Sequence, residues 1–232
     1  MHGLSFIIPA HDEERLLGPT LKAIAVASGA LGERPQVIVA DDASTDRTAT
    51  VAREHGAFVV AVNRRQIAAA RNAGASAATG EMLVFVDADT IVPPAVLRAA
   101  VAAYNGGAVG GGARVTADAA ARPWARRALH GASWVLNIPR WAAGCFVFAR
   151  RDAFERVAGF DERFYASEEI HLSRALKRLG RFVIVQDRVI TSARKAEMYS
   201  FKHTLWLLAK MLVNPWSLRR RDRLPFWYER RN

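Results

Sequence analysis

Short apolar runs alternate with helical stretches along the first half of the chain. Continuous apolar runs of the kind typical of buried strands occur at residues 6–8, 37–40, 58–61 and 82–86. Helical composition lies between them, at residues 13–30, 44–54 and 66–78. Strands that alternate with helices predict an α/β fold of βαβ units with parallel pairing and right-handed crossovers. Uninterrupted apolar strands further predict a sheet that helices cover on both faces.

The second half of the chain has a less regular pattern. Strand-like runs occur around residues 108–109, at 144–149, at 182–185 and at 189–190. Helical patterns occupy residues 122–137, 151–157, 167–179 and 197–213. No linker or internal repeat divides the sequence into independent domains.

Acidic residues come directly after three of the predicted strands. The three segments are His11-Asp12-Glu13, Asp41-Asp42 and Asp87-Ala88-Asp89. Ligands of open α/β sheets bind beyond the carboxyl ends of the strands, so these segments are expected to meet at one site. Core packing gives no reason to place acids there.

Asp87 and Asp89 are separated by one residue and can point at one ligand from the turn after a strand. Hard divalent cations suit such oxygens, and Mg²⁺-type ions commonly bridge one or two carboxylates to substrate phosphates. A metal ion here would act as a Lewis acid and neutralise charge on a departing diphosphate. The alternative is an ordinary turn, in which aspartate is common.

Two further features fit a nucleotide site. Asp41 and Asp42 can hydrogen-bond a base or ribose, although a turn with a helix cap explains them as well. Arg71 lies on the predicted helix before the strand that ends at Asp87. Its forked donors suit a diphosphate, and a surface salt bridge is the alternative.

Taken together, these segments resemble the family 2 glycosyltransferases of GT-A fold. The matching segments, in order and spacing, are residues 8–14, 41–46, 70–74 and 85–89, followed by 144–151, 159–162 and 168–169. The resemblance covers roughly residues 4 to 192. It implies a GT-A domain over residues 1–195, with a Rossmann-like, mostly parallel central sheet, a nucleotide-binding half at about 1–105 and an acceptor-binding half at about 106–195.

The resemblance also implies roles for single residues of the nucleotide pocket. The loop after the first strand would line that pocket with Pro9, Ala10, His11 and Glu13. Most relatives have tyrosine or phenylalanine at position 11, so His11 departs from the pattern. Asp42, alone or with Asp41, matches the residue that reads the nucleobase or ribose. Arg71 matches an arginine that packs near the base and diphosphate.

The Asp87-Ala88-Asp89 segment matches the donor and metal site of the family. Asp87 would touch the ribose or a metal-bound water, and Ala88 would lie beside the nucleotide sugar. Asp89 would be the principal ligand of a divalent metal, Mg²⁺ or Mn²⁺, with Asp87 as the second acid of the site.

Glu168 and Glu169 stand where the family has a Glu-Asp pair. The second residue of that pair deprotonates the acceptor hydroxyl, so Glu169 is the expected base. Glu168 is the alternative, because general base catalysis is sensitive to reach. Acids at a helix N-terminus are also favoured by the helix dipole alone. One base and a metal-bound leaving group imply direct displacement with inversion, and Cys145 is expected in the core rather than as a nucleophile.

Charge narrows the range of partners. The 232 residues carry a formal net charge of +11, and residues 194–232 hold ten Lys and Arg against three acids. The expected basic helical extension at 196–232 is either a solubilising surface or a landing patch for phosphate-bearing ligands or an anionic membrane. An apolar stripe at 198–213 packs on the domain or on a second subunit of a homodimer, or lies in a membrane interface.

The expected location is cytoplasmic, with membrane association as an alternative. No run approaches the ~20 apolar residues that span a bilayer, no signal peptide precedes the first strand, and the single cysteine cannot form an internal disulfide. Residues 186–190 do not match the Gln-x-x-Arg-Trp motif of processive family members, which favours a single-transfer enzyme. The acceptor is open: a glycan, a small molecule or, for an interfacial tail, a lipid phosphate.

Two other functions compete with a glycosyltransferase. A sugar nucleotidyltransferase typically needs a glycine-rich, basic loop after the first strand, and the loop at residues 9–14 is acidic and lacks glycine. A basic nucleic-acid-binding module would explain the tail. It would leave the clustered acids unexplained, because they repel phosphate without a metal, so nucleic acid is not an expected partner.

Overall fold

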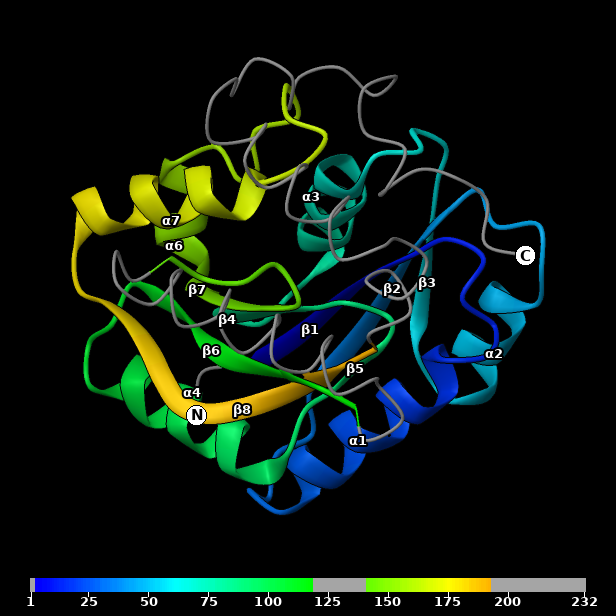
Figure 1. The fold of residues 1–232 in the computed structure, drawn as a ribbon, viewed down its shortest axis with the longest axis horizontal. Coiled ribbons are helices and arrows are strands. Elements are labelled where there is room, and N and C mark those ends of the chain that lie inside the picture. Colours follow the sequence, from blue (N-terminus) through cyan, green and yellow to red (C-terminus); the bar gives the residue numbers. More distant parts are fainter. Residues whose placement is uncertain (1–2, 119–140, 193–232) are drawn as a thin grey trace, which may run out of the picture.

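The computed structural model describes residues 3–118 and 141–192. The strands in this part of the chain are β1 (Leu4–Ala10), β2 (Gln36–Asp42), β3 (Phe58–Val62), β4 (Met82–Val86), β5 (Thr90–Ile91), β6 (Gly110–Ala117), β7 (Phe146–Arg150) and β8 (Phe182–Thr191). The helices are α1 (Leu17–Gly29), α2 (Thr48–Glu54), α3 (Ile67–Ala77), α4 (Pro94–Asn105), α6 (Arg151–Arg156) and α7 (Glu168–Leu179). The strands form one sheet in the order β3-β2-β1-β4-β7-β6-β8-β5 (Figure 1).

The first half of the sheet confirms the predicted parallel βαβ arrangement. β1 pairs in parallel with β2 on one side and with β4 on the other, and β2 pairs in parallel with β3. The strand order therefore reverses at β1. In open α/β sheets, the carboxyl ends of the strands beside such a reversal form the ligand site.

The second half makes the sheet mixed. β7 runs antiparallel to both β4 and β6, β6 and β8 are parallel, and the short β5 is antiparallel to β8. β8 is one strand where the sequence pattern predicts two pieces. Its exposed polar residues Gln186, Asp187 and Arg188 interrupt the apolar run without ending the strand, and the pairing with β6 shifts register between Ala113 and Arg114.

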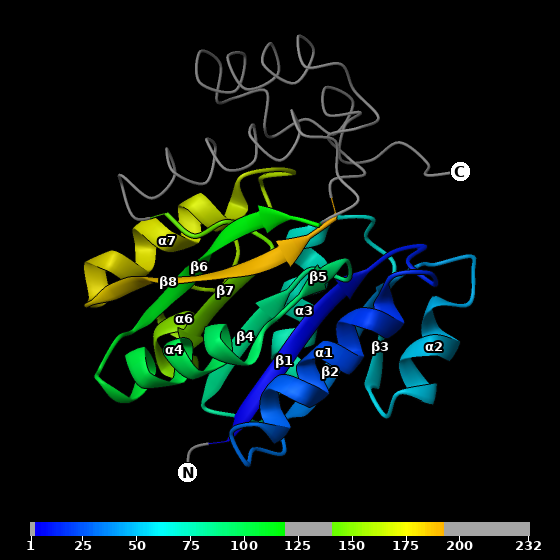
Figure 2. The same ribbon diagram turned by 60° about the horizontal axis from the view of Figure 1, so that its bottom comes forward.

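Helices cover both faces of the sheet, as the uninterrupted apolar strands predict (Figure 2). Alternate residues of one strand point to opposite faces. In β1, Phe6 and Ile8 belong to the cluster with α1 and α4, whereas Ile7 packs in the cluster with α3, α6 and α7. α2 lies beside α1. This packing holds the carboxyl ends of β1 to β4 at one edge of a rigid sheet.

The glycine cluster at residues 110–112 lies inside a strand, whereas the sequence pattern places the strand just before it. A Cβ atom at Gly111 would overlap the carbonyl oxygen of Val183 and lie 2.5 Å from the ring of Phe148. Glycine therefore lets β6 pass between β8 and the large side chain on β7.

Several expected features lie outside the described residues. These are the predicted helices at 122–137 and 197–213 and the basic extension at 196–232. Within the ranges that the structure describes, none of the helices has the length and apolar character needed to cross a bilayer.

The close approach at Gly111 can be tested with Gly111→Ala. We expect a loss of about 1–3 kcal/mol in the free energy of unfolding, because overpacking displaces backbone or ring atoms. Urea unfolding followed by circular dichroism would measure it. Gly29→Ala is the matched control, since nothing lies within 4 Å of the added methyl group there. Equal stability of the two variants would contradict the close approach.

Candidate functional site

The predicted site residues meet at the carboxyl edge of the sheet. Register places Ala10 beside Asp41 and Asp42 beside Val62, so the loops after β1, β2 and β3 begin at one level. Val86 at the end of β4 pairs with Phe146, which brings Gly144 and Cys145 to the same edge. We call this edge, with the loops that leave it, the rim.

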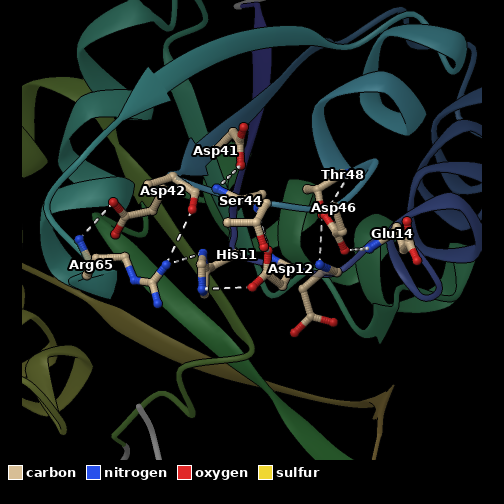
Figure 3. A network of polar contacts seen from close by, with 12 residues as sticks. His11, Asp12, Glu14, Asp41, Asp42, Ser44, Asp46, Thr48 and Arg65 are labelled. Atoms are coloured by element: carbon tan, nitrogen blue, oxygen red, sulfur yellow. Dashed lines mark hydrogen bonds and ion pairs between the residues drawn. The ribbon is translucent and has the colours of Figure 1, made fainter. Parts of the chain in front are cut away.

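The loops after β1 and β2 are joined by hydrogen bonds (Figure 3). The backbone N–H of Asp12 donates to Ser44 Oγ at 3.0 Å, and Asp12 Oδ1 accepts from the Thr45 N–H at 2.7 Å. The Glu14 N–H donates to Asp46 Oδ2 at 3.1 Å. The side chains of Asp12, Ser44 and Asp46 therefore join the two loops by hydrogen bonds.

His11 and Glu13, both expected in the nucleotide pocket, lie differently within this first loop. Glu13 is buried, and its N–H donates to Thr48 Oγ1 at 2.8 Å. His11 is half-buried, with Nδ1 3.3 Å from Arg65 Nη1 and Nε2 3.2 Å from Asp12 Oδ2. His11 thus lies between Arg65 and Asp12 and links the loop before α3 to the first loop.

Asp12 is held as an anion at this position. Partial burial by itself raises its pKa, but the hydrogen bond from the Thr45 N–H and the nearby His11 outweigh burial and lower the pKa below its ordinary value. Asp12 also has a positive φ of 52°. A negatively charged carboxylate and a left-handed backbone at Asp12 therefore accompany the contact with the second loop.

Three neighbouring loops of the rim contain non-glycine residues in the left-handed region. Asp12, Ala43 and Arg65 have φ values of 52°, 58° and 50°. The Arg65 side chain joins the other two loops, because Nη1 also donates to the Ala43 carbonyl at 3.3 Å. Strained backbone of this kind concentrates at functional sites. The sequence pattern did not single out Arg65, since αL geometry gives no signal at an arginine.

Asp41 and Asp42 differ in how far their carboxylates are engaged. Asp42 is buried, and its two oxygens accept the backbone N–H groups of Arg64, Arg65 and Gln66 at 2.7–2.8 Å. It thereby caps the loop that leads into α3. Asp41 is half-buried and accepts one bond, from the Ser44 N–H at 3.3 Å. Of the two, Asp41 has more capacity left for a ligand.

The segment after β4 presents two carboxylates on a fixed turn. Ala88 is buried, and its carbonyl accepts from Thr20 Oγ1 at 2.9 Å. Asp87 remains 24% exposed. Asp89 is half-buried and accepts from Thr191 Oγ1 at 3.3 Å, which ties it to the end of β8.

These donors suit a hard divalent cation. Within residues 3–118 and 141–192, no group of three or more His, Cys, Asp or Glu side chains forms a complete metal cage. Mg²⁺-type ions do not need one, because they keep waters and bind one or two carboxylates together with substrate phosphates. Asp87 and Asp89 have partly exposed carboxylates, which are oxygen donors of that kind.

Arg71 is buried at the rim, and its guanidinium is bound to protein groups. Its side chain is 1% exposed, and its guanidinium donates to Asp87 at 2.8 Å, to the Gly144 carbonyl at 2.7 Å and to Glu168. Burial alone lowers the pKa of Arg71, but the charges of Asp87 and Glu168 outweigh it and keep the group protonated. These contacts engage the guanidinium with protein groups.

Glu168 and Glu169 open α7 and differ in environment. Glu168 is buried and paired with Arg71. Glu169 is half-buried, and a Cβ atom at Gly144 would lie 3.4 Å from both its carboxyl carbon and Arg71 Nη2. Burial, assisted by the charge of Glu168 and partly offset by Arg71, raises the pKa of Glu169 to about 8. A carboxyl with such a pKa can take up a proton near neutral pH.

Cys145 is buried beside these acids. Burial is the main cause that raises the pKa of its thiol, and the charges of Asp87 and Asp89 act in the same direction. Its burial agrees with the expectation of a core position, and a protonated thiol is a poor nucleophile.

Two side chains that sequence reasoning did not single out hold the segment before α7. The Asn72 side chain donates to the Phe160 carbonyl and accepts from the Phe160 N–H, both at 2.9 Å. Gln66 Nε2 donates to the carbonyls of Glu162 and Phe164. Only long-range contacts reveal these roles, since amide side chains carry no periodic signal.

The sequence of residues 5–164 matches the model of a known protein family, described as Glycosyl transferase family 2. The chain belongs to this family. The assignment agrees with the resemblance found in the sequence and with a rim that holds paired acids after β4 and at the start of α7.

Curated relatives match part of this family 2 chain. Validoxylamine A glucosyltransferase of Streptomyces hygroscopicus subsp. jinggangensis is 35% identical over 110 residues, which are 44% of this chain and 26% of that protein. Undecaprenyl-phosphate 4-deoxy-4-formamido-L-arabinose transferase of Enterobacter sp. is 31% identical over 114 residues, 46% of this chain and 35% of that protein. The alignments thus cover about a quarter to a third of those relatives.

Solved structures show the GT-A fold. Mannosyltransferase PcManGT from Pyrobaculum calidifontis, in complex with GDP-Man and Mn²⁺, superposes with a TM-score of 0.68 at 24% identity, over 94% of this chain and 72% of that one. TarS of S. aureus gives a TM-score of 0.64 at 17% identity, over 97% of this chain and 77% of that one. At these sequence identities the structural similarity shows the fold alone.

The different engagement of the two rim aspartates predicts different effects of their removal. Asp42→Ala should lower the free energy of unfolding by about 1–3 kcal/mol, because it leaves three N–H groups before α3, that of Gln66 buried, without their acceptor. Asp41→Ala, the matched control, should change stability by less than about 1 kcal/mol. Urea unfolding of both variants measures this, and a larger loss in Asp41→Ala would reverse the assignment.

Proposed function

We propose that this family 2 glycosyltransferase moves a sugar from a UDP- or GDP-linked donor to an acceptor, with inversion at the anomeric carbon and with Mg²⁺ or Mn²⁺ bound. The observation that carries the proposal is the single network in which Arg71 joins Asp87, on the donor side, to Glu168, next to Glu169. Donor acids and a candidate base thus lie around one guanidinium. The fold neighbour in complex with GDP-Man and Mn²⁺ supports the choice of ligand class.

Residues after β1 and β2 would bind the nucleotide. Pro9, Ala10 and His11 would line its pocket, and Asp41 has the freer carboxylate for an N–H of the base or a ribose hydroxyl. Asp42 would act through the loop that it caps. In this assignment Glu13 and Ala88, both buried, shape the pocket more than they contact the ligand.

Asp89, with Asp87, would hold the metal ion beside the diphosphate. The bound metal would neutralise the charge that grows on the leaving group. Hydrogen bonds hold this segment at two residues: Thr191 Oγ1 donates to Asp89, and Thr20 Oγ1 donates to the Ala88 carbonyl. The carboxylates are therefore positioned before the donor binds.

Glu169 would act as the general base. The acceptor oxygen attacks the anomeric carbon, the bond from that carbon to the diphosphate oxygen breaks, and its electron pair leaves with the nucleotide diphosphate. Glu169 takes the proton of an attacking hydroxyl. The structure favours Glu169 over Glu168 for this role, because Glu168 is buried in its pair with Arg71.

The acceptor class is proposed from chemistry and from relatives. Relatives include a transferase named for undecaprenyl phosphate and another named for validoxylamine A. A lipid phosphate fits the basic residues 194–232, since Lys and Arg are attracted to anionic membrane surfaces. We therefore rank an acceptor at a membrane surface first and a soluble small molecule second. The base role of Glu169 applies to a hydroxyl acceptor, because an ionised lipid phosphate has no proton for Glu169 to take.

The metal role predicts that Asp89→Ala loses metal-dependent nucleotide binding. Calorimetric titration with UDP and with GDP, each with and without Mn²⁺, should show that the gain in affinity from Mn²⁺ falls by at least about tenfold. The melting temperature should stay close to that of the wild type. Asp187→Ala, at an exposed position of β8, is the control. An undiminished Mn²⁺ effect in Asp89→Ala would rule out the metal role.

The base role predicts that Glu169→Gln binds nucleotide normally and loses transfer by about 10²–10⁴-fold. Glu162→Gln, at an exposed carboxylate, is the control and should keep both properties.

The pH profile of the wild type provides a second readout of the base. A base acts only when deprotonated, so the rate should rise with pH, reach half of its maximum near the pKa of Glu169, about 8, and level off above that pH. The residual rate of Glu169→Gln should lack this limb. Retained transfer in Glu169→Gln, or an unchanged limb, would assign the proton to another group.

A further inference from the structure

One guanidinium joins the two sides of the proposed site. Arg71 Nη2 donates to Asp87, on the donor side, and Nη1 donates to Glu168, at the start of the helix that carries the base. Because the guanidinium is planar and its N–H groups have fixed directions, two carboxylates bound to it are also fixed relative to each other. Arg71 thus sets the relative positions of Asp87 and Glu168.

The guanidinium is itself held in place. Its carbon lies 5.1 Å from the centre of the Phe160 ring. Asn72, the next residue of α3, grips the backbone of Phe160 through two hydrogen bonds. Consecutive residues of one helix therefore fix the arginine and the ring against which it packs.

The same contacts argue against direct binding of the diphosphate by Arg71. The side chain is 1% exposed, and both Nη atoms donate to buried or partly buried oxygens. A phosphate would have to displace a carboxylate from a buried ion pair, and breaking such a pair leaves an uncompensated charge in the interior.

We infer that Arg71 is a positioning residue, which holds Asp87 and the start of α7 in one frame and so places Glu169 for attack, without touching the donor. The inference rests on the proposed function and adds that Arg71 acts through its two carboxylate partners. Misplacement of reacting groups by about 1 Å can lower a rate by about 10²-fold. Arg71 should therefore matter for turnover more than for nucleotide affinity.

The test uses Arg71→Lys, which keeps the positive charge and loses the planar fork. We expect kcat to fall by about 10²-fold, while the affinities for UDP and GDP measured in EDTA stay unchanged. EDTA removes any metal contribution through Asp87. Arg151→Lys is the matched control, because Arg151 binds the Gly80 carbonyl, which lies before β4 at the opposite edge of the sheet. It should keep both kcat and affinity.

A second variant guards against a folding defect in Arg71→Lys. Glu168→Gln keeps an acceptor for Nη1 while it removes the charge of the pair. It should also lower kcat without changing nucleotide affinity in EDTA. The double variant should lose little more than the more affected single variant, because residues that act through one contact are not additive.

Three results would overturn the inference. Weaker binding of UDP and GDP in EDTA by about tenfold or more in Arg71→Lys, the effect of losing a charge-assisted bond, would mean that Arg71 contacts the diphosphate. Full retention of kcat in Arg71→Lys, or strictly additive losses in the double variant, would remove the positioning role. A wild-type protein that binds neither nucleotide and transfers no sugar would instead refute the proposed function, and this inference with it.

Discussion

The buried guanidinium of Arg71 is the interaction on which the rim depends. Burying a charge is unfavourable unless ion pairs and hydrogen bonds compensate for it, and Arg71 is compensated by Asp87, Gly144 and Glu168 together. Those partners come from three segments of the chain. Because all three partners bind the same guanidinium, the segment after β4, the segment before β7 and the start of α7 lie close together.

Polar side chains also hold together the loops after β1, β2 and β3. Two aspartates that follow strands hold neighbouring loops: Asp12 binds the second loop, and Asp42 caps the third. The positive φ values of Asp12, Ala43 and Arg65 accompany these bonds. Ligand binding at such a rim requires that its loops be built first, and strained backbone there is held by the surrounding hydrogen bonds.

The mixed half of the sheet completes the site from the other side. Because β7 runs antiparallel to β4, the residues before β7 lie at the same edge as the residues after β4. Gly144 and Cys145 thereby reach Asp87, and β8 delivers Thr191 to Asp89. The family 2 fold thus forms its rim with elements of both halves of the chain.

The sequence by itself determined the α/β class, the parallel half of the sheet, the family and the residues expected at the rim. Apolar periodicity and acidic residues after strands involve residues close together in the sequence, so they can be recognised from the sequence alone. The tertiary structure decided the antiparallel pairings, the position of β6 and the difference between Asp41 and Asp42. It also decided the burial of Arg71 and the environments that set Glu168 and Glu169 apart. These depend on contacts between residues distant along the chain, such as Arg71 and Glu168, 97 positions apart, and no local pattern records which partner a charge will find.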